Sequence, residues 1–212
     1  MKPFSVKLMS TVAFALSMVA PAFAAPETLL DFEAVSSFAP IGEFYNGGAD
    51  GTGHVGPALG VSFGGDALGL VNDFDTYFTH APSPVGIMTP VGASSTMNVA
   101  AGFTQGLGLS YASSAAVTNG VQVWSGLNGT GSLLASFNLA ANATTGCSDS
   151  AYCHFDQAVR TFTGTAHSVT FGNATYAAGF DNVRMGAVPE PSAWSMALAA
   201  CGVLFAMSRR RV

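Results

Sequence analysis

Short runs of alternating apolar and polar residues, bounded by Gly, Asn or Pro, constrain most strongly what this chain can fold into. Leu107, Leu109 and Tyr111 alternate with Gly and Ser, and Val121 and Val123 are separated by Gln. This period of two places the apolar side chains on one face of a strand and leaves its other face to solvent. About ten such runs follow one another at short spacing, without a convincing helical period between residues 25 and 187. We therefore predict an all-β fold, an antiparallel β-sandwich of the jelly-roll type.

In chain order, the predicted strands are 29–33, 60–63, 67–71, 95–100, 106–111, 120–124, 133–139, 158–163, 168–171 and 179–185. Gly64, Gly65 and Asp66 separate the second run from the third and predict a hairpin between them. Residues 41–57 hold too many glycines for a strand, and residues 80–84 hold two prolines, so both are predicted loops. Long loops of a sandwich are where binding residues collect.

The first 24 residues have the three parts of a secretory signal peptide. Lys2 and Lys7 give a positive start, residues 8–20 are apolar apart from Ser and Thr, and residues 22–24 (Ala-Phe-Ala) form a small-x-small cleavage site. We predict cleavage after Ala24 by signal peptidase and passage of the rest through the export machinery. An uncleaved anchor is the alternative.

A second apolar segment, residues 193–207, lies near the C-terminal end and carries no charge. As a helix it would be about 22 Å long, which is short of the ~30 Å hydrocarbon core unless flanking residues and arginine stems extend it. Trp194 at one end suits the headgroup level, and Arg209, Arg210 and Arg211 at the other match the positive-inside rule. We predict a transmembrane helix; a buried C-terminal core helix is the alternative that length alone would favour.

The motif Val188-Pro189-Glu190-Pro191 directly precedes this segment. Motif, apolar helix and arginine cluster, in that order over residues 188–212, resemble the PEP-CTERM sorting signal of Gram-negative bacteria. The resemblance implies recognition of the Pro-Glu-Pro tripeptide by exosortase, a membrane-embedded cysteine protease, and removal of the helix. It predicts a chain that is exported across the inner membrane, transiently anchored there, and then placed at the cell surface or outside the cell.

Residues 25–187, between the two terminal segments, are long enough for one exported domain with its own core. They contain eleven acidic residues, no lysine, and only Arg160 and Arg184 as basic residues, so their formal charge is −9 against −5 for the whole chain. A surface this acidic would be repelled by phosphate backbones and by anionic membranes. We therefore expect no nucleic-acid binding.

Four motifs are spaced along this middle segment: residues 31–33 (Asp-Phe-Glu), residues 46–48 (Asn-Gly-Gly) followed by residues 60–63 (Gly-Val-Ser-Phe), residues 124–131 around an Asn-Gly-Thr-Gly sequence, and residues 179–183 (Gly-Phe-Asp-Asn-Val). They resemble motifs of the small all-β ectodomains often found upstream of this sorting signal, which look like carbohydrate-binding jelly rolls. The resemblance supports the fold more directly than it supports a ligand.

The same resemblance implies one structural calcium ion where the first and last strands meet. Calcium takes six to eight oxygen ligands, and Glu33 and Asp181 would lie at that junction. The loop around Asn46 and Asp50 would add carbonyl oxygens. The alternative is that these acids are solvent-exposed or cap turns at strand ends.

Cys147 and Cys153 lie six positions apart in a polar loop of a chain that we expect to be exported. An oxidising periplasm favours a disulfide between them. His154 is adjacent, but no second Cys or His pair completes the four ligands of a metal site. We therefore predict the disulfide, with Cys201 left in the apolar C-terminal segment.

Catalytic motifs are weak. Residues 60–64 spell the G-x-S-x-G of a hydrolase nucleophile elbow, but that mechanism needs a helix after the Ser, where a strand is predicted. Trp124 and Tyr111 are aromatic residues on which a sugar ring would stack. The histidines are dispersed and are expected to be loop or surface residues: His54, His80, His154 and His167.

These observations predict a non-enzymatic surface or extracellular-matrix protein, sorted by an exosortase-type system and associated with exopolysaccharide. The alternative is a carbohydrate-binding module that recognises an extracellular polysaccharide. That alternative predicts aromatic side chains gathered on one face or at the loop ends. A hydrolase, the third class, predicts a clustered acid pair or a Ser/His/Asp set, and no such spacing occurs in the sequence.

Overall fold

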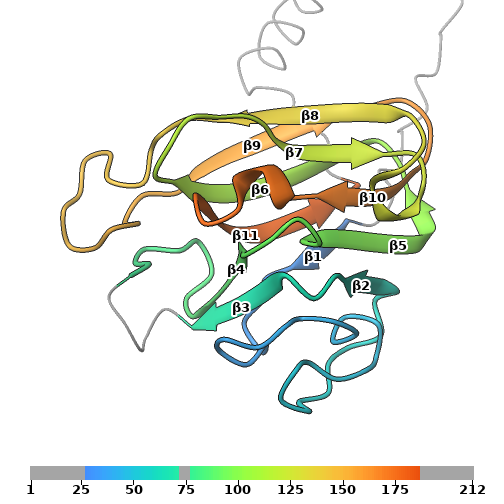
Figure 1. Cartoon of the computed structure of the whole chain (residues 1–212), viewed down its shortest axis with the longest axis horizontal. Coiled ribbons are helices and arrows are strands. Elements are labelled where there is room, and N and C mark those ends of the chain that lie inside the picture. The colour runs from blue at the N-terminus through green and yellow to red at the C-terminus, as the bar shows by residue number, and fades with distance from the viewer. Residues whose placement is uncertain (1–26, 72–76, 187–212) are drawn as a thin grey trace, which may run out of the picture.

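Two antiparallel sheets stack face to face in the computed structural model, which describes residues 27–71 and 77–186 (Figure 1). The strand order is β3-β4-β11-β6-β9 in the first sheet, where β1 also pairs with β11, and β2-β5-β10-β7-β8 in the second. The first sheet contains β1 (Thr28–Leu30), β3 (Ala67–Val71), β4 (Gly86–Pro90), β6 (Gly106–Ser113), β9 (Asp156–Thr161) and β11 (Ala178–Met185). The second contains β2 (Val61–Phe63), β5 (Thr96–Phe103), β7 (Val117–Trp124), β8 (Leu133–Leu139) and β10 (Ala166–Thr170). Two short 3₁₀ turns are η1 (Leu127–Gly129) and η2 (Gly172–Ala174).

The predicted β-sandwich is therefore confirmed, and each predicted run overlaps a strand. Its jelly-roll topology stays a prediction. The predicted signal peptide (1–24) and sorting segment (188–212) lie outside the described residues. Within the described part of the chain, no helix has the length and apolar character needed to cross a membrane.

The predicted hairpin around residues 64–66 is wrong. β2 pairs with β5 in the second sheet, whereas β3 pairs with β4 in the first. The three residues between them therefore carry the chain from one sheet to the other. The Gly64 amide donates to the Thr96 carbonyl at 2.9 Å, and the Asp66 carboxylate accepts from the Ser94 amide at 2.9 Å. Both bonds tie this crossing to the start of β5 instead of closing a two-strand turn.

The core between the sheets is built from alternate residues of nearly every strand, with Phe180 of β11 packed edge to face on Phe171 at 5.0 Å between ring centroids. A second, smaller cluster covers the outer face of the first sheet and contains Phe78, Ile87 and Tyr152. All eight residues of β6 are buried as a result. The prediction that the alternate face of residues 107–111 is open to solvent is therefore wrong.

β4 and β1 lie end to end along the same edge of β11, since Phe180 pairs with Met88 and residues 183–185 pair with β1. The pairing of β11 with its other neighbour shifts register between Asp181 and Arg184. The fully buried Asp181 carboxylate therefore sits at a break in the sheet edge.

The glycine-rich loop of residues 41–57, predicted correctly as irregular, lies beside β2 and β3 at the lower edge of Figure 1. Its interior is organised by Asp50, a residue that is only 6% exposed. The carboxylate accepts from the backbone amides of Ser36 at 2.9 Å, Thr52 at 2.9 Å and His54 at 3.0 Å. This carboxylate adds to the isolated bridges of the loop, which pair Asn46 with Ala58 and Ala49 with Val55.

Candidate functional site

A groove on the outer face of the first sheet gathers the exposed aromatic side chains of the domain. Among the described residues, the aromatic side chains more than half exposed are Phe38 (67%), Tyr77 (54%) and Tyr176 (75%). All three line the same hollow of about 330 Å³, with Leu70 of β3 and Thr89 of β4 on its sheet side. Three segments far apart in sequence thus converge on one surface.

The backbones of Phe38 and Tyr176 are held by the sheet itself. The Phe38 amide donates to the Gly69 carbonyl at 2.8 Å, and the Tyr176 amide donates to the Pro90 carbonyl at 3.0 Å. Both residues have positive φ angles, 58° and 57°. A bulky side chain in this region costs about 1–3 kcal/mol, and such positions persist where the surroundings impose them, frequently at binding sites. The strain is a second indication that these rings are displayed for contact.

The third ring, Tyr77, is fixed through the loop that contains the disulfide. Cys147 and Cys153 are bonded, which confirms that prediction. The carbonyl of Tyr152, next to Cys153, accepts from the Thr79 amide at 2.9 Å, and the Tyr152 amide donates to the Tyr77 carbonyl at 3.0 Å. The Tyr152 ring stacks on Phe78 at 4.5 Å between centroids. The disulfide loop therefore supports one wall of the groove.

Replacement of both bonded cysteines by serine should lower the free energy of unfolding by about 2 kcal/mol, because a seven-residue loop recovers its entropy in the unfolded chain. Thermal unfolding of wild type and variant in non-reducing buffer measures this. Dithiothreitol should lower the melting temperature of wild type and leave that of the variant unchanged; an equal response of both would contradict a structural disulfide.

The groove has a neutral, largely apolar wall. None of the described residues that line it carries a charge, and the polar groups there are hydroxyls of tyrosine and threonine. Thr89 already donates to the Ala178 carbonyl at 3.1 Å. Flat aromatic faces with hydroxyls at their edges suit a ligand that has both apolar C–H faces and hydroxyl groups.

The predicted calcium residues do meet across one segment. Asp181 accepts from the Ser83 amide and the Ser83 hydroxyl, both at 2.8 Å, and from the Asn182 amide at 2.6 Å. Glu33 accepts from the amides of Val85 at 3.1 Å and Gly86 at 3.0 Å. Both carboxylates thus bind the chain that enters β4.

The charge at this junction is not balanced by a cation in the part of the chain that the structure describes. The pKa of Asp181 is raised to about 6, chiefly by burial and further by the negative charge of Glu33, while hydrogen bonds from Ser83 and Asn182 oppose the rise. The oxygens present fit calcium in kind: two carboxylates, the Ser83 hydroxyl and the Asp31 carbonyl, which accepts from that hydroxyl at 3.1 Å. Calcium binding by Glu33 and Asp181 stays a prediction.

Carbonyl ligands from the 41–57 loop stay a prediction, but the side chains of Asn46 and Asp50 have other partners. Asp50 is occupied inside its own loop, and Asn46 lies beside β2, where its amide donates to Glu43 at 2.8 Å. Elsewhere in the described residues, Cys147, Asp149 and Cys153 bring three metal-ligand atoms close together. The two sulfurs are joined in the disulfide, so they are not available as thiolate ligands.

The remaining predicted site residues have structural explanations. Ser62 lies inside β2, opposite Asn98 of β5, as expected for a strand and not for a nucleophile elbow. Tyr111 is buried and its hydroxyl accepts from the Ala140 amide, so its prediction as a sugar platform is wrong. Trp124 is half-buried on the second sheet and donates to Thr170 at 3.2 Å.

The histidines occupy separate segments, each with its own neighbour. His154 pairs with Asp156 at 3.1 Å, and His80 lies 3.5 Å from Asp149. His167 contacts the Val99 carbonyl, and the His54 ring lies 5.7 Å from that of Phe44. The sorting residues Val188, Pro189, Glu190 and Pro191, and the anchor residues Trp194, Arg209, Arg210 and Arg211, lie outside the described residues.

Sequence reasoning missed the groove residues Phe38, Tyr77 and Tyr176. Each is an aromatic residue that lies between two predicted strands and follows small polar residues, such as Ser36-Ser37 before Phe38 and Thr175 before Tyr176. An aromatic residue isolated in this way has no strand partner to pack against, and that is the signal that could have identified it.

Comparisons with known proteins give distant structural similarity alone. No family model and no curated protein matches the sequence. A mutant of a family 29 carbohydrate-binding module is 9% identical, with a TM-score of 0.40 over 76% of this chain and 91% of that one. The K2 cleaved adhesin domain of Lys-gingipain is 9% identical, with a TM-score of 0.44 over 76% and 99%. Similarity this low transfers no ligand to this chain.

Proposed function

We propose that this chain is an exported, non-enzymatic surface or matrix protein whose β-sandwich binds a neutral polysaccharide in the aromatic groove. The observation that carries the proposal is the convergence of Phe38, Tyr77 and Tyr176, the three most exposed aromatic side chains of the described residues, on one hollow. A pyranose ring presents axial C–H groups on its faces and hydroxyls at its edge. Aromatic faces take the former, and tyrosine hydroxyls take the latter.

The charge of the domain selects against an acidic polymer. Residues 25–187 carry a formal charge of −9, and a polyanion would be repelled from such a surface at low salt. The groove also contains none of the arginines or lysines with which proteins bind carboxylate or sulfate groups. A neutral polysaccharide satisfies both conditions.

The proposed route rests on the terminal sequences. Export by the N-terminal signal and processing by an exosortase-type protease at residues 188–191 would deliver the domain to the layer where such a polysaccharide lies. Mass spectrometry of the protein from the envelope and medium of its native host should find an N-terminus at Ala25 and no residues of the 193–212 segment. A secreted form intact through Val212 would contradict the sorting route.

Affinity electrophoresis of residues 25–187, which contain both sheets and both cores, tests the binding function. Gels containing soluble β-glucan, galactomannan or dextran represent neutral polymers, and polygalacturonate represents an acidic one. We expect retardation in at least one neutral gel, none in polygalacturonate, and about tenfold weaker binding for Tyr176→Ala, since one stacked ring contributes about 1.4 kcal/mol.

The matched control is Leu133→Ala, which removes an exposed apolar side chain from the second sheet. It should leave retardation unchanged, while Phe38→Ala and Tyr77→Ala should weaken it as Tyr176→Ala does. Wild-type mobility equal to that of a non-binding reference protein in all three neutral gels would make the proposed function wrong.

A further inference from the structure

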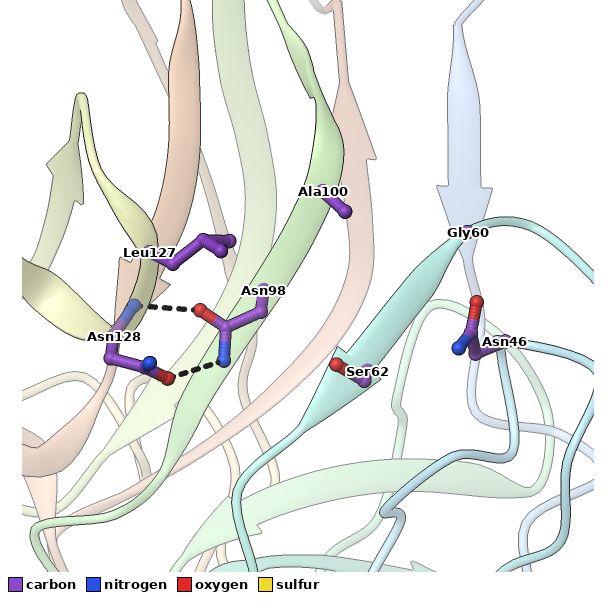
Figure 2. Close-up of a pocket in the computed structure, with 7 residues that line it drawn as sticks. All are labelled: Asn46, Gly60, Ser62, Asn98, Ala100, Leu127 and Asn128. Carbon is purple, nitrogen blue, oxygen red and sulfur yellow. Dashed lines mark hydrogen bonds between the residues drawn. The ribbon is translucent and has the colours of Figure 1, made fainter.

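A second hollow lies on the outer face of the other sheet and is lined by amides. It measures about 200 Å³ and is bounded by Asn46, Ser62, Asn98 and Asn128, with Ala100 and Leu127 as its apolar members. Figure 2 shows Asn98 and Ala100 on one strand, Ser62 on the neighbouring strand, Asn128 on one side and Asn46 on the other. No residue with a charged side chain lines it among those that the structure describes.

Two of its amides hold each other in place. The Asn128 backbone amide donates to the Asn98 side-chain oxygen at 2.8 Å, and the Asn98 side-chain nitrogen donates to the Asn128 side-chain oxygen at 2.9 Å (Figure 2). Asn128 has a left-handed backbone, with φ 55° and ψ 37°. The pair is therefore oriented before any ligand arrives, which lowers the entropy cost of binding.

The turn that carries Asn128 is itself fastened to the sheet. The buried Ser168 hydroxyl donates to the Gly126 carbonyl at 2.6 Å and accepts from the Gly129 amide at 2.9 Å. One hydroxyl of β10 thus fixes both ends of η1. These bonds hold η1 in a fixed position over the outer face of the second sheet, next to β5.

The amides keep hydrogen-bonding capacity toward the hollow. Each side-chain oxygen of the Asn98–Asn128 pair has a second lone pair, and the Asn128 side-chain nitrogen and the Ser62 hydroxyl make no bond among the described residues. Neutral donors and acceptors on a small apolar floor suit the hydroxyl edge of a sugar. Leu127, 43% exposed, offers an apolar contact for its ring.

The two hollows face opposite directions. Val61 and Val99 point into the core between the sheets, so Ser62 and Asn98 point outward from the second sheet. Ile87 belongs to the outer cluster of the first sheet and Met88 to the core, so Thr89 points outward from the first. The sandwich therefore separates the amide hollow from the aromatic groove.

We propose that the amide hollow is a second binding site for a neutral glycan, and that the domain cross-links two polysaccharide chains through its opposite faces. The proposal rests on the proposed function for the ligand class and adds a site and a valency to it. A polysaccharide repeats its binding unit, so many such domains can bridge the same two chains, and after the first bridge each further one forms at a raised effective concentration. Such a domain would act as a non-covalent cross-linker within a matrix.

The test combines affinity electrophoresis with turbidity, using β-glucan, galactomannan and dextran as polymers. Asn98→Ala combined with Asn128→Gly removes both amides, and glycine keeps the left-handed backbone at 128 without strain. We expect this variant to bind three- to tenfold more weakly than wild type and to lose polymer aggregation. Tyr176→Ala should also bind weakly without aggregating, and the variant with all three changes should not bind.

Ala100→Glu is the second test variant, because it fills the hollow from β5 and leaves the amide pair intact. Gln157→Ala is the control, since that exposed amide of β9 lines neither hollow. Amide variants with wild-type affinity and aggregation would overturn the second site while the aromatic groove stands. A wild type that binds polymer but never aggregates it would overturn cross-linking, and a wild type that binds no polymer would overturn both proposals.

Discussion

Calcium-free protein should become more stable as the pH falls from 7 to 4, by about 2.4 kcal/mol from Asp181 alone. The pKa of this fully buried carboxyl lies near 6, raised from 3.8 chiefly by burial. The folded state therefore binds a proton that the unfolded state does not, over a range of about two pH units. This contribution is complete below pH 3.8 and is lost as the pH rises through 6.

Urea unfolding in EDTA at several pH values measures this dependence, with Asp181→Asn as the comparison. The introduced side-chain amide faces the Ser83 backbone amide with a donor in place of an acceptor, so the variant should be less stable than wild type. Position 181 of the variant does not titrate, so it should add no pH dependence to the variant's stability. The difference between wild type and variant should therefore grow as the pH falls. Parallel curves would show that Asp181 does not titrate in this range.

Calcium would reverse the trend. An ion held by Glu33 and Asp181 favours the ionised carboxylates, so calcium should raise the melting temperature at pH 7 and lose this effect near pH 5. Glu33→Gln is the matched variant, since it keeps an acceptor for the amides of Val85 and Gly86 and removes one charge. A wild-type melting temperature equal in calcium and EDTA at pH 7 would contradict the calcium prediction.

The strands were predictable because the period of two is a local property of the sequence. Which strand pairs with which was not predictable, because pairing depends on residues far apart in the chain. β6 and β7 show clear alternation, and both form where expected. β4 was missed because Ile87 and Met88 are apolar in succession, one facing the outer cluster and the other the core. Its pattern carries no alternation, since both faces of this strand are covered.

The two proposed binding surfaces depend on contacts that sequence spacing does not encode. Phe38 and Tyr176 adopt positive φ because strands β3 and β4 hold their amides, and no local signal announces that. The Asn98–Asn128 pair joins residues thirty positions apart. The disulfide was predictable because its two cysteines are close along the chain and the terminal sequences indicate export.

Replacing Asp50 by alanine should destabilise the domain by about 3 kcal/mol and weaken both proposed binding sites. Three backbone amides lose a charged acceptor, and each such hydrogen bond contributes about 1.5–3 kcal/mol. The expected loss is smaller than their sum, because water hydrogen-bonds to part of the exposed amides in the variant. The Ser36 bond fixes the segment that carries Phe38 of the aromatic groove. The 41–57 loop that Asp50 organises carries Asn46 of the amide hollow.

The pH dependence of Asp50 runs opposite to that of Asp181. Burial raises its pKa, but hydrogen bonds from Ser36 and Thr52 outweigh burial and hold the pKa well below its ordinary 3.8. Its contribution to stability is therefore present above pH 3.8 and is lost as the pH falls below that value. Calcium-free wild type should be most stable near pH 4 to 5, between the two windows.

Urea unfolding of Asp50→Ala and Asp50→Asn, together with electrophoresis in the neutral polymers, tests this expectation. The asparagine variant keeps one acceptor and should lose about half as much stability, and neither variant should share the wild-type loss below pH 4. Glu27→Ala is the control, because it removes an exposed charge and should change neither stability nor binding. An Asp50→Ala protein that is destabilised but binds polymer like wild type would separate the loop from both sites, and the proposed link between the loop and the binding surfaces would then be wrong.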